Sequence, residues 1–555
     1  MARALALAAA IAVSLLAVSG AGGAGAQTPR FGGILVFGTQ GAQGGIREHA
    51  CLNPLLARCT PAGRVPFALY IGETVLPGAF EARPDYTWRP KLVSDAEYTT
   101  TPPYTITYKI HTRARWNDGV PVSAQDFVFT YEANVALKGQ LYDSTLVEQV
   151  RRVRVLDRKT VRVFLRSRFA DWRGLFGIVL PRHALVGEDL TRIWADRIDN
   201  PKTGGPIGSG PFLVQRWEPG RQVTLVRNSR YWGAHRAYLD RLVIRFRMSS
   251  FDPVDWFRSG EVDLAHHFAQ LYIAGVRREE GIRLVLDPPT ALYEHFTFRV
   301  KGGHPALEQG RRGSKLVRQA LAFGMDRPAL LRNSAFGAAN PSYRPLESVV
   351  FFPQSPYHRA SWSIYRHDPE RARRLLEAAG CRRGGDGIYS CANERLSLRI
   401  VTSSGLPLRA EVLTLLQAQL RRIGVEVIPV YTPGGPLTTP APSERYDVAY
   451  SAWSFNNPSL SRMKAIYGCG GEENFAGYCQ RLVTRDLDQA DRILSAGKRA
   501  RALNRADAQI AKDVPVIPLV QVAFPAAFRT NVRGYVLSPF NPLWGAENWW
   551  LARER

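Results

Sequence analysis

The segment 104–134 passes through a strand, a turn and a helix in immediate succession. Its opening residues alternate between hydrophobic and polar, which is the pattern of a half-buried strand. The turn follows at 116–119 (WNDG), where Asp and Gly tolerate the backbone angles of a tight reversal. Ser123 and Asp126 have the spacing of a capping box, so a helix is predicted to begin near Ala124.

Other segments extend this α/β pattern. A strand is predicted at 396–401, a helix at 409–423 that Gly424 ends, and a second strand at 425–430. Such a βαβ unit implies parallel strands with a right-handed crossover. A β-hairpin is predicted over 153–165, and helices are predicted to begin at Asp368–Pro369 and to dominate 481–513.

The segment 104–134 resembles the signature block of the family 5 extracellular solute-binding proteins, the dipeptide- and oligopeptide-binding receptors of ABC importers. Further blocks resemble that family in the family's own order, at 206–212, 228–233, 239–241, 259–263, 317–327, 368–380 and 446–453. Together these blocks extend over nearly the whole chain after its N-terminal segment.

The resemblance implies an α/β fold of the two-lobed periplasmic-binding-protein type, the large cluster C form, with mixed sheets and a two-strand hinge. It assigns 27–292 and 521–555 to lobe I, and 293–520 to lobe II. The chain would cross between the lobes near Tyr293 and near Pro518. A chain of 555 residues also exceeds what one hydrophobic core supports, so two large lobes are expected on length alone.

Residues 1–26 have the pattern of a secretory signal peptide. Arg3 precedes an apolar stretch from Leu5 to Val18, and small residues end the segment before Gln27. The stretch is shorter than the ~20 residues of a membrane-spanning helix, although retention as an anchor is the alternative. Because no cysteine lies near the cleavage site for lipid attachment, we expect a periplasmic or secreted protein.

The formal net charge of +25 raises the possibility of a nucleic acid or an anionic membrane as partner. The basic residues are scattered along the chain, however, and they form no basic motif interleaved with aromatic residues. A solvated basic surface without a nucleic-acid partner is therefore expected.

The six cysteines fall into three close pairs, and export makes disulfides plausible. Connectivity does not follow from sequence alone. Proximity predicts three local bridges: Cys51–Cys59, Cys381–Cys391 and Cys469–Cys479. A metal site is not expected at these cysteines, because they form no C-x-x-C motif and their spacing does not match that of zinc ligands.

Catalytic motifs are missing from the sequence, including the G-x-S-x-G elbow, H-E-x-x-H, the Walker loop and G-x-G-x-x-G. Ser209, within Gly-Ser-Gly, is interpreted as part of a structural turn. His266 and His267 are interpreted as polar positions on opposite faces of a strand. The acidic pairs at 279–280 and 472–473 are expected to be solvated. We therefore predict a protein that is not an enzyme and has no cofactor or bound metal.

The best binding candidates follow a predicted strand that ends at Trp453. Planar side chains beside amide groups suit an extended polar ligand. In peptide receptors of the family the matching loop lines the cleft, and the alternative is that Trp453 only packs between the lobes. The candidate ligand-binding residues are Gln40, Tyr293, Trp453, Ser454, Phe455, Asn456 and Asn457.

The resemblance implies a monomeric receptor that captures a peptide or peptide-like ligand between two lobes and delivers it to an ABC transporter permease. A receptor for a nickel complex, haem or a sugar is the alternative within the family, and a secreted hydrolase is the alternative outside it. Peptide receptors of the family carry an acid three residues after the loop Trp, which neutralises the ligand's α-amino group. This chain has Asn456 there, so a ligand without a free amine is predicted, unless Glu294 supplies the charge.

Overall fold

The computed structural model describes residues 28–39, 51–59, 67–194, 198–246, 248, 250, 252–286, 290–432, 446–455, 457–522 and 524–553. The expected signal peptide, 1–26, lies outside these residues. No helix in the described ranges is both long enough and apolar enough to cross a membrane.

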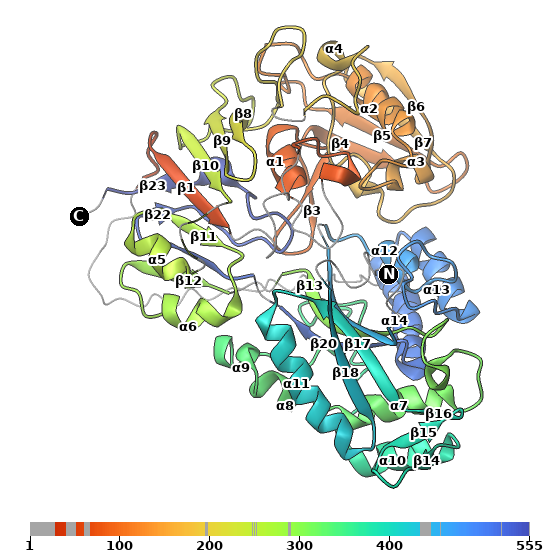
Figure 1. Cartoon of the computed structure of the whole chain (residues 1–555). Helices are drawn as coiled ribbons and strands as arrows, with labels where there is room; N and C mark the ends of the chain where they lie inside the picture. The colour runs from red at the N-terminus through yellow and green to blue at the C-terminus, as the bar shows by residue number, and fades with distance from the viewer. Residues whose placement is uncertain are drawn as a thin grey trace, which may run out of the picture.

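Two sheets form the upper part of the molecule in Figure 1, which we call the first body. The seven-stranded sheet is mixed, because β1 runs parallel to β10 and β11 whereas the other pairs are antiparallel. Its strands in spatial order are β12 (Ile282–Val285), β21 (Ala526–Arg529), β11 (Leu264–His266), β1 (Ile34–Thr39), β10 (Arg241–Arg245), β9 (Gln222–Arg227) and β8 (Phe212–Glu218).

The second sheet of the first body is antiparallel. Its strands in spatial order are β4 (Val93–Tyr98), β5 (Thr105–Ile110), β7 (Thr160–Leu165) and β6 (Val150–Asp157). The predicted hairpin is β6–β7. Helix α2 (Ala124–Ala136) begins at the predicted residue, and the Ser123 backbone N–H donates to the Asp126 carboxylate at 2.7 Å. Gly119 has a φ of +96°, so the predicted turn uses the left-handed region that glycine tolerates.

Shorter elements complete the first body. They are α1 (Phe67–Val75), α3 (Thr145–Gln149), α4 (Arg182–Leu185), α5 (Pro253–Arg258), α6 (Ile273–Val276), the pair β2 (Phe80–Ala82) and β3 (Trp88–Pro90), and the pair β22 (Val532–Arg533) and β23 (Trp550–Leu551).

A five-stranded sheet organises the lower part of Figure 1, which we call the second body. Its strands in spatial order are β18 (Glu426–Thr432), β17 (Ser397–Ser403), β19 (Val448–Ser454), β13 (Leu292–Phe298) and β20 (Val516–Gln521). Strands β17 and β18 are parallel and flank α11 (Pro407–Arg422), which confirms the predicted βαβ unit. Gly424, with a φ of +76°, follows that helix as predicted.

The other helices of the second body are α7 (Ser314–Gly324), α8 (Arg327–Arg332), α9 (Ala335–Ala339), α10 (Pro369–Ala378), α12 (Arg462–Tyr467), α13 (Arg481–Arg492) and α14 (Ala496–Asp513). A small three-stranded sheet contains β14 (Arg382–Arg383), β15 (Tyr389–Cys391) and β16 (Glu394–Arg395). The side chain of Asp368 accepts from the Arg371 N–H at 2.8 Å, so it caps α10 as the sequence predicts.

Each body has its own large hydrophobic core. One core is built from buried residues between Leu35 and Leu264 together with the C-terminal segment, and the other from buried residues between Ala291 and Val522 together with Phe540. The chain passes from the first body into the second just before β13 and returns just after β20. These two strands are antiparallel neighbours, with Tyr293 opposite Gln521. The described residues thus contain two large hydrophobic cores, and the exact bounds of the lobes stay a prediction.

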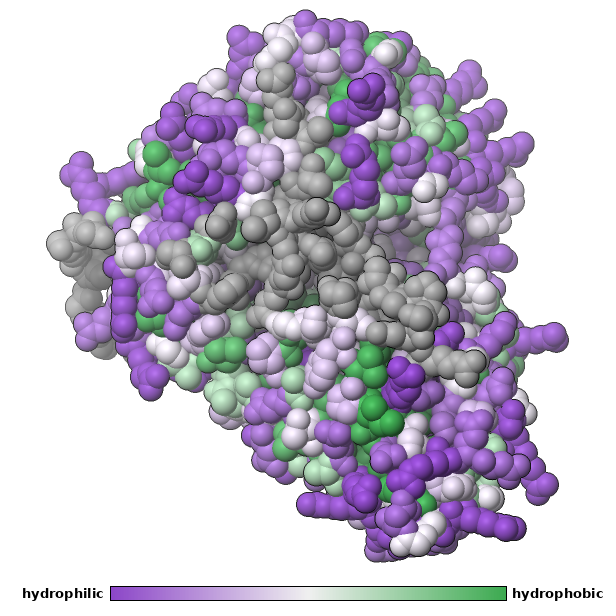
Figure 2. Space-filling view, in the orientation of Figure 1, coloured by the Kyte–Doolittle hydropathy of each residue, from purple (hydrophilic) through white to green (hydrophobic). Residues whose placement is uncertain are grey.

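The six cysteines form three disulfides, which are the local pairs that proximity predicts. Cys51–Cys59 lies in the first body, whereas Cys381–Cys391 and Cys469–Cys479 lie in the second. Figure 2 shows mainly hydrophilic side chains on the visible face of both bodies, in agreement with the solvated surface expected from the charge.

Candidate ligand site at the junction of the two bodies

Strand β13 brings several predicted site residues to one end of the five-stranded sheet. It pairs with β19 so that Tyr293 lies opposite Trp453 and Leu292 lies opposite Ser454. The Phe455 N–H then donates to the Ala291 carbonyl at 2.8 Å, which continues the pairing beyond the strand. Tyr293, Trp453, Ser454 and Phe455 therefore gather beside the point where the chain enters the second body.

Trp453 lies within a stack of aromatic rings. Its ring is nearly parallel to those of His295 and Phe475, with centroid distances of 5.8 Å and 5.9 Å. The Arg462 guanidinium lies 5.3 Å from the centroid of the Trp453 ring, a cation–π geometry. Only 7% of Trp453 is exposed, so most of its surface packs inside the second body in this conformation.

Tyr293 and Phe455 form a second stack, with ring centroids 6.4 Å apart. The Tyr293 hydroxyl lies 2.9 Å from the Tyr467 hydroxyl, which satisfies its polar atom inside the core. Burial raises the pKa of the Tyr293 phenol, so this group is neutral. These residues build the apolar wall behind the loop that follows β19.

Of the remaining candidate residues, the structure describes Ser454 and Asn457. Ser454 is exposed, and its carbonyl accepts from Arg462 at 2.6 Å. The Asn457 side chain accepts from the Ser459 N–H at 2.9 Å, which is a turn interaction. Gln40 and Asn456 lie outside the described residues. A ligand-binding role stays a prediction for all of them.

A disulfide-closed loop supports the aromatic wall from behind. Cys469 and Cys479 close a loop that carries Phe475, which stacks on Trp453, and Glu473. Glu473 accepts two hydrogen bonds from Arg462, at 2.6 Å and 2.7 Å. The sequence predicts Glu473 only as one of two adjacent solvated acids. Its pairing with Arg462 depends on the tertiary fold, and no sequence motif indicates it.

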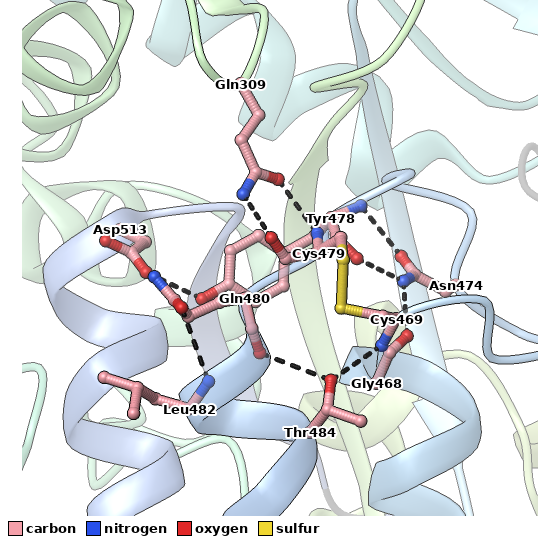
Figure 3. The surroundings of a disulfide bond; sticks show 10 residues. All are labelled: Gln309, Gly468, Cys469, Asn474, Tyr478, Cys479, Gln480, Leu482, Thr484 and Asp513. Carbon is pink, nitrogen blue, oxygen red and sulfur yellow. Dashed lines mark hydrogen bonds between the residues drawn. A yellow bond between two sulfur atoms is a disulfide. The ribbon is translucent and has the colours of Figure 1, made fainter.

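Figure 3 shows how the same loop is fixed by hydrogen bonds around its disulfide. Gln309 makes two bonds to the backbone of Cys479, the Asn474 amide donates to the Gly468 carbonyl at 2.7 Å, and the Thr484 hydroxyl accepts from the Cys469 N–H at 2.9 Å. The loop is therefore held at both ends and across its middle.

Glu294, considered above as a counter-charge for a ligand, already has a partner. Its carboxylate accepts two hydrogen bonds from Arg409, at 2.9 Å and 3.0 Å, and both side chains are buried. The neighbouring His295 is fully buried, and burial lowers the pKa of its imidazole to about 3, so it is neutral. Recruiting Glu294 for a ligand ammonium would leave Arg409 buried without its counter-ion.

The residues considered for catalysis or metal binding have other environments. Ser209 is fully buried, and its hydroxyl donates to the Arg115 carbonyl at 3.0 Å. The expectation that His266 and His267 share a strand is wrong, because β11 ends at His266 and His267 follows with a φ of +58°, its ring tilted against that of Phe524. Among the described residues, no group of three or more His, Cys, Asp or Glu side chains is arranged to hold a metal ion.

A groove of about 890 Å³ lies where Arg168 of the first body faces α13. Besides the Cys469–Cys479 disulfide, its lining includes three further arginines, Arg481, Arg485 and Arg492. None of the predicted ligand-binding residues lines this groove. We call the boundary between the two bodies the seam, and it is thus partly open to solvent on this side.

Comparison with known proteins agrees with the fold. Residues 87–474 match the model of the bacterial extracellular solute-binding proteins, family 5. The chain is 27% identical over 481 residues to the oligopeptide-binding protein OppA of Mycobacterium tuberculosis, a match that covers 83% of this chain and 77% of that protein.

Solved structures give the same result. The periplasmic EDTA-binding protein EppA superposes with a TM-score of 0.81 at 21% identity, covering 95% of this chain and 98% of that one. The oligopeptide-binding protein AppA of Bacillus subtilis, solved with a nonapeptide, superposes with a TM-score of 0.75 at 19% identity, covering 95% and 100%. With the family model extending over most of the sequence, this chain belongs to family 5 of the bacterial extracellular solute-binding proteins.

Proposed function

We propose that this chain is an extracytoplasmic receptor that encloses a peptide or peptide-like ligand between its two bodies and delivers it to the permease of an ABC importer. The observation that carries the proposal is the junction itself. Two separate cores are joined through the neighbouring strands β13 and β20, and an aromatic wall that ends in the exposed Ser454 lies at the same place. Similarity to OppA and AppA supports a peptide as the class of ligand.

The mechanism in this proposal is reversible binding without bond cleavage. Residues 27–292 and 521–555 act as one lobe and 293–520 as the other, and β13 and β20 act as the hinge. Contacts that the ligand makes to both lobes stabilise the closed state. The receptor works as a monomer in the periplasm or outside the cell, after cleavage of residues 1–26.

The ligand in this proposal has no free ammonium group at the end that meets the 454–458 loop. Asn456 is a neutral residue at the position where the family's peptide receptors carry an acid. Three described acids beside this part of the chain are already paired with arginines: Glu294 with Arg409, Glu473 with Arg462 and Asp171 with Arg499. A buried ammonium without a counter-charge is unfavourable, so a blocked or modified peptide, or a non-peptide ligand, suits the site better. The similarity to an EDTA-binding protein makes the non-peptide ligand a specific alternative.

Calorimetric titration with matched oligopeptides, free or acetylated at the N-terminus, tests this proposal. We expect the acetylated peptides to bind more tightly and to be recovered intact, which mass spectrometry would verify. The Glu294→Gln variant should keep the same preference. Tighter binding of the free-amine peptides that persists in Glu294→Gln would contradict the ligand preference. Binding of neither set would contradict a peptide receptor.

A further inference from the structure

One carboxylate of the first body is bound entirely by groups of the second body. Asp171 precedes the short 3-10 helix Trp172–Gly174 and is only 6% exposed. Its Oδ2 accepts hydrogen bonds from the backbone N–H groups of Leu460 and Ser461, both at 2.8 Å, and from the Ser461 hydroxyl at 2.7 Å.

Arg499 of α14 completes the contact. Its two terminal nitrogens donate to the two oxygens of Asp171, each at 2.6 Å, which is the bidentate geometry of a strong charge-assisted pair. Beside it, the backbone N–H of Ala170 donates to the Asp491 carbonyl at 2.7 Å. A two-residue segment of the first body is thus bound to α12, α13 and α14, which lie directly below the four-stranded sheet in Figure 1.

The electrostatics favour an ionised carboxylate at this position. Burial opposes the charge on Asp171, but the Arg499 guanidinium and the Ser461 donors outweigh it and lower the pKa of the carboxyl. The Arg499 side chain is 12% exposed, so solvent screens the pair weakly. When the two bodies separate, water can solvate each of these polar groups, whereas a continuous apolar core cannot be divided in this way.

Two of the groups that hold Asp171 come shortly after the candidate site in the chain. Leu460 and Ser461 come two and three positions after Pro458, and the Phe455 N–H at the start of the loop donates to the Ala291 carbonyl just before β13. Phe455 is therefore held by the second body, whereas Leu460 and Ser461, a few positions later, are bound to Asp171 of the first body.

We propose that Asp171 is a positioning residue that latches the two bodies together and sets the position of the part of the loop from Asn457 to Ser461 when they close. This inference rests on the proposed function, because it assumes that the bodies separate and close. It assigns part of the closing free energy to a contact that the ligand does not make. The apparent affinity for a ligand depends on the fraction of the protein that is closed. Loss of the Asp171 contact would therefore weaken the binding of any ligand at this site.

The test compares two substitutions of buried aspartates that pair with arginines of α14. Asp171→Asn removes the charge across the seam. The matched control, Asp486→Asn, acts on a pair within the second body, where Arg505 donates to Asp486 at 3.0 Å. Spin labels attached through non-natural amino acids at the exposed positions 156 and 428 report the distance between the bodies in the ligand-free protein.

We expect Asp171→Asn to lower the ratio of closed to open protein by about tenfold, and Asp486→Asn to leave the distance distribution unchanged. The milder Ser461→Ala, which keeps both charges, should shift the distribution in the same direction by less. An unchanged distribution in folded Asp171→Asn or in Ser461→Ala would overturn the latch.

A second measurement separates this inference from the ligand proposal. For the N-acetylated oligopeptides, stopped-flow dissociation from Asp171→Asn should be about tenfold faster than from the unmodified protein or Asp486→Asn. Because the distance measurement requires no ligand, a shifted distribution without any peptide binding supports the latch and contradicts only the peptide class of ligand. Equal dissociation rates in all three proteins would contradict the role of Asp171 in positioning the loop.

Discussion

At the scale of single residues, the main charged and hydroxyl groups buried at the junction pair with one another. Glu294 and Arg409 neutralise each other, and the Tyr293 hydroxyl meets that of Tyr467. Such groups maintain the shape of the wall instead of offering unpaired charges to a ligand. This arrangement is consistent with a ligand recognised mainly through apolar contacts and neutral hydrogen bonds.

The buried pair of Glu294 and Arg409 gives a prediction for stability. Glu294→Gln should reduce the free energy of unfolding by about 3 kcal/mol, because it leaves the Arg409 guanidinium buried without its counter-ion. Urea denaturation measures this change. The double variant Glu294→Gln/Arg409→Met should lose less than the two single changes added together. A loss below about 0.5 kcal/mol in Glu294→Gln would show that the pair is not maintained in solution.

Asp507 on α14 gives a prediction for pH dependence. It is fully buried, and burial raises the pKa of its carboxyl from 3.8 to about 6, against hydrogen bonds from Ser361 and Val349. The Asp507 carboxyl in the folded state therefore stays protonated over a pH range in which the same carboxyl in the unfolded chain is already ionised. The contribution of Asp507 to stability therefore falls as the pH rises from about 4 to 6, and it stays low above that range.

Asp507→Asn removes this titration. The free energy of unfolding of the variant, minus that of the unmodified protein, should be higher at pH 8 than at pH 4 by about 3 kcal/mol. Urea denaturation of both proteins at the two pH values gives the comparison. The same difference between variant and unmodified protein at pH 4 and pH 8 would contradict the raised pKa.

At the scale of elements, local patterns were sufficient where local interactions decide the structure. The capping residues of α2 and α10, the β6–β7 hairpin and the β17–α11–β18 unit all follow from spacing within one segment. Sequence could not predict that Arg462 would bind Glu473 across an aromatic stack. It also missed Asp171, whose partners lie 289 to 328 positions away and have no motif. Contacts of this kind depend on how the two bodies meet.

The Cys469–Cys479 loop gives a prediction at this scale. Replacing both cysteines by serine should lower the free energy of unfolding by ~2 to 3 kcal/mol in the chain-entropy model. It should also weaken ligand binding, because Phe475 and Glu473 would lose their fixed positions behind Trp453.

The matched control is the double serine variant at Cys381 and Cys391, whose loop has the same sequence separation of 10 residues. That variant should lose similar stability but keep its affinity for the N-acetylated oligopeptides in calorimetry. Equal affinities in the two variants would show that the 469–479 loop does not support the site.

At the scale of the whole molecule, two bodies with separate large cores share two strand crossings, a polar contact at Asp171 and a further contact at α9, where Arg277 donates to the Ala339 carbonyl at 3.3 Å. An interface with polar contacts and a partly open seam is compatible with rigid-body motion, whereas one continuous core is not. A solvated basic surface without a nucleic-acid partner stays a prediction from the scatter of the basic residues along the sequence.

Small-angle X-ray scattering of the mature protein, with and without ligand, tests the central claim of a closing receptor most directly. The ligand would be the small molecule that co-purifies with the protein, identified by mass spectrometry and then removed and added back. We predict that the radius of gyration decreases at saturation, because the ligand shifts an open population to the closed arrangement. The melting temperature should rise by mass action in the same samples. A radius of gyration that stays unchanged at saturation, while the melting temperature rises, would contradict a receptor that closes around its ligand.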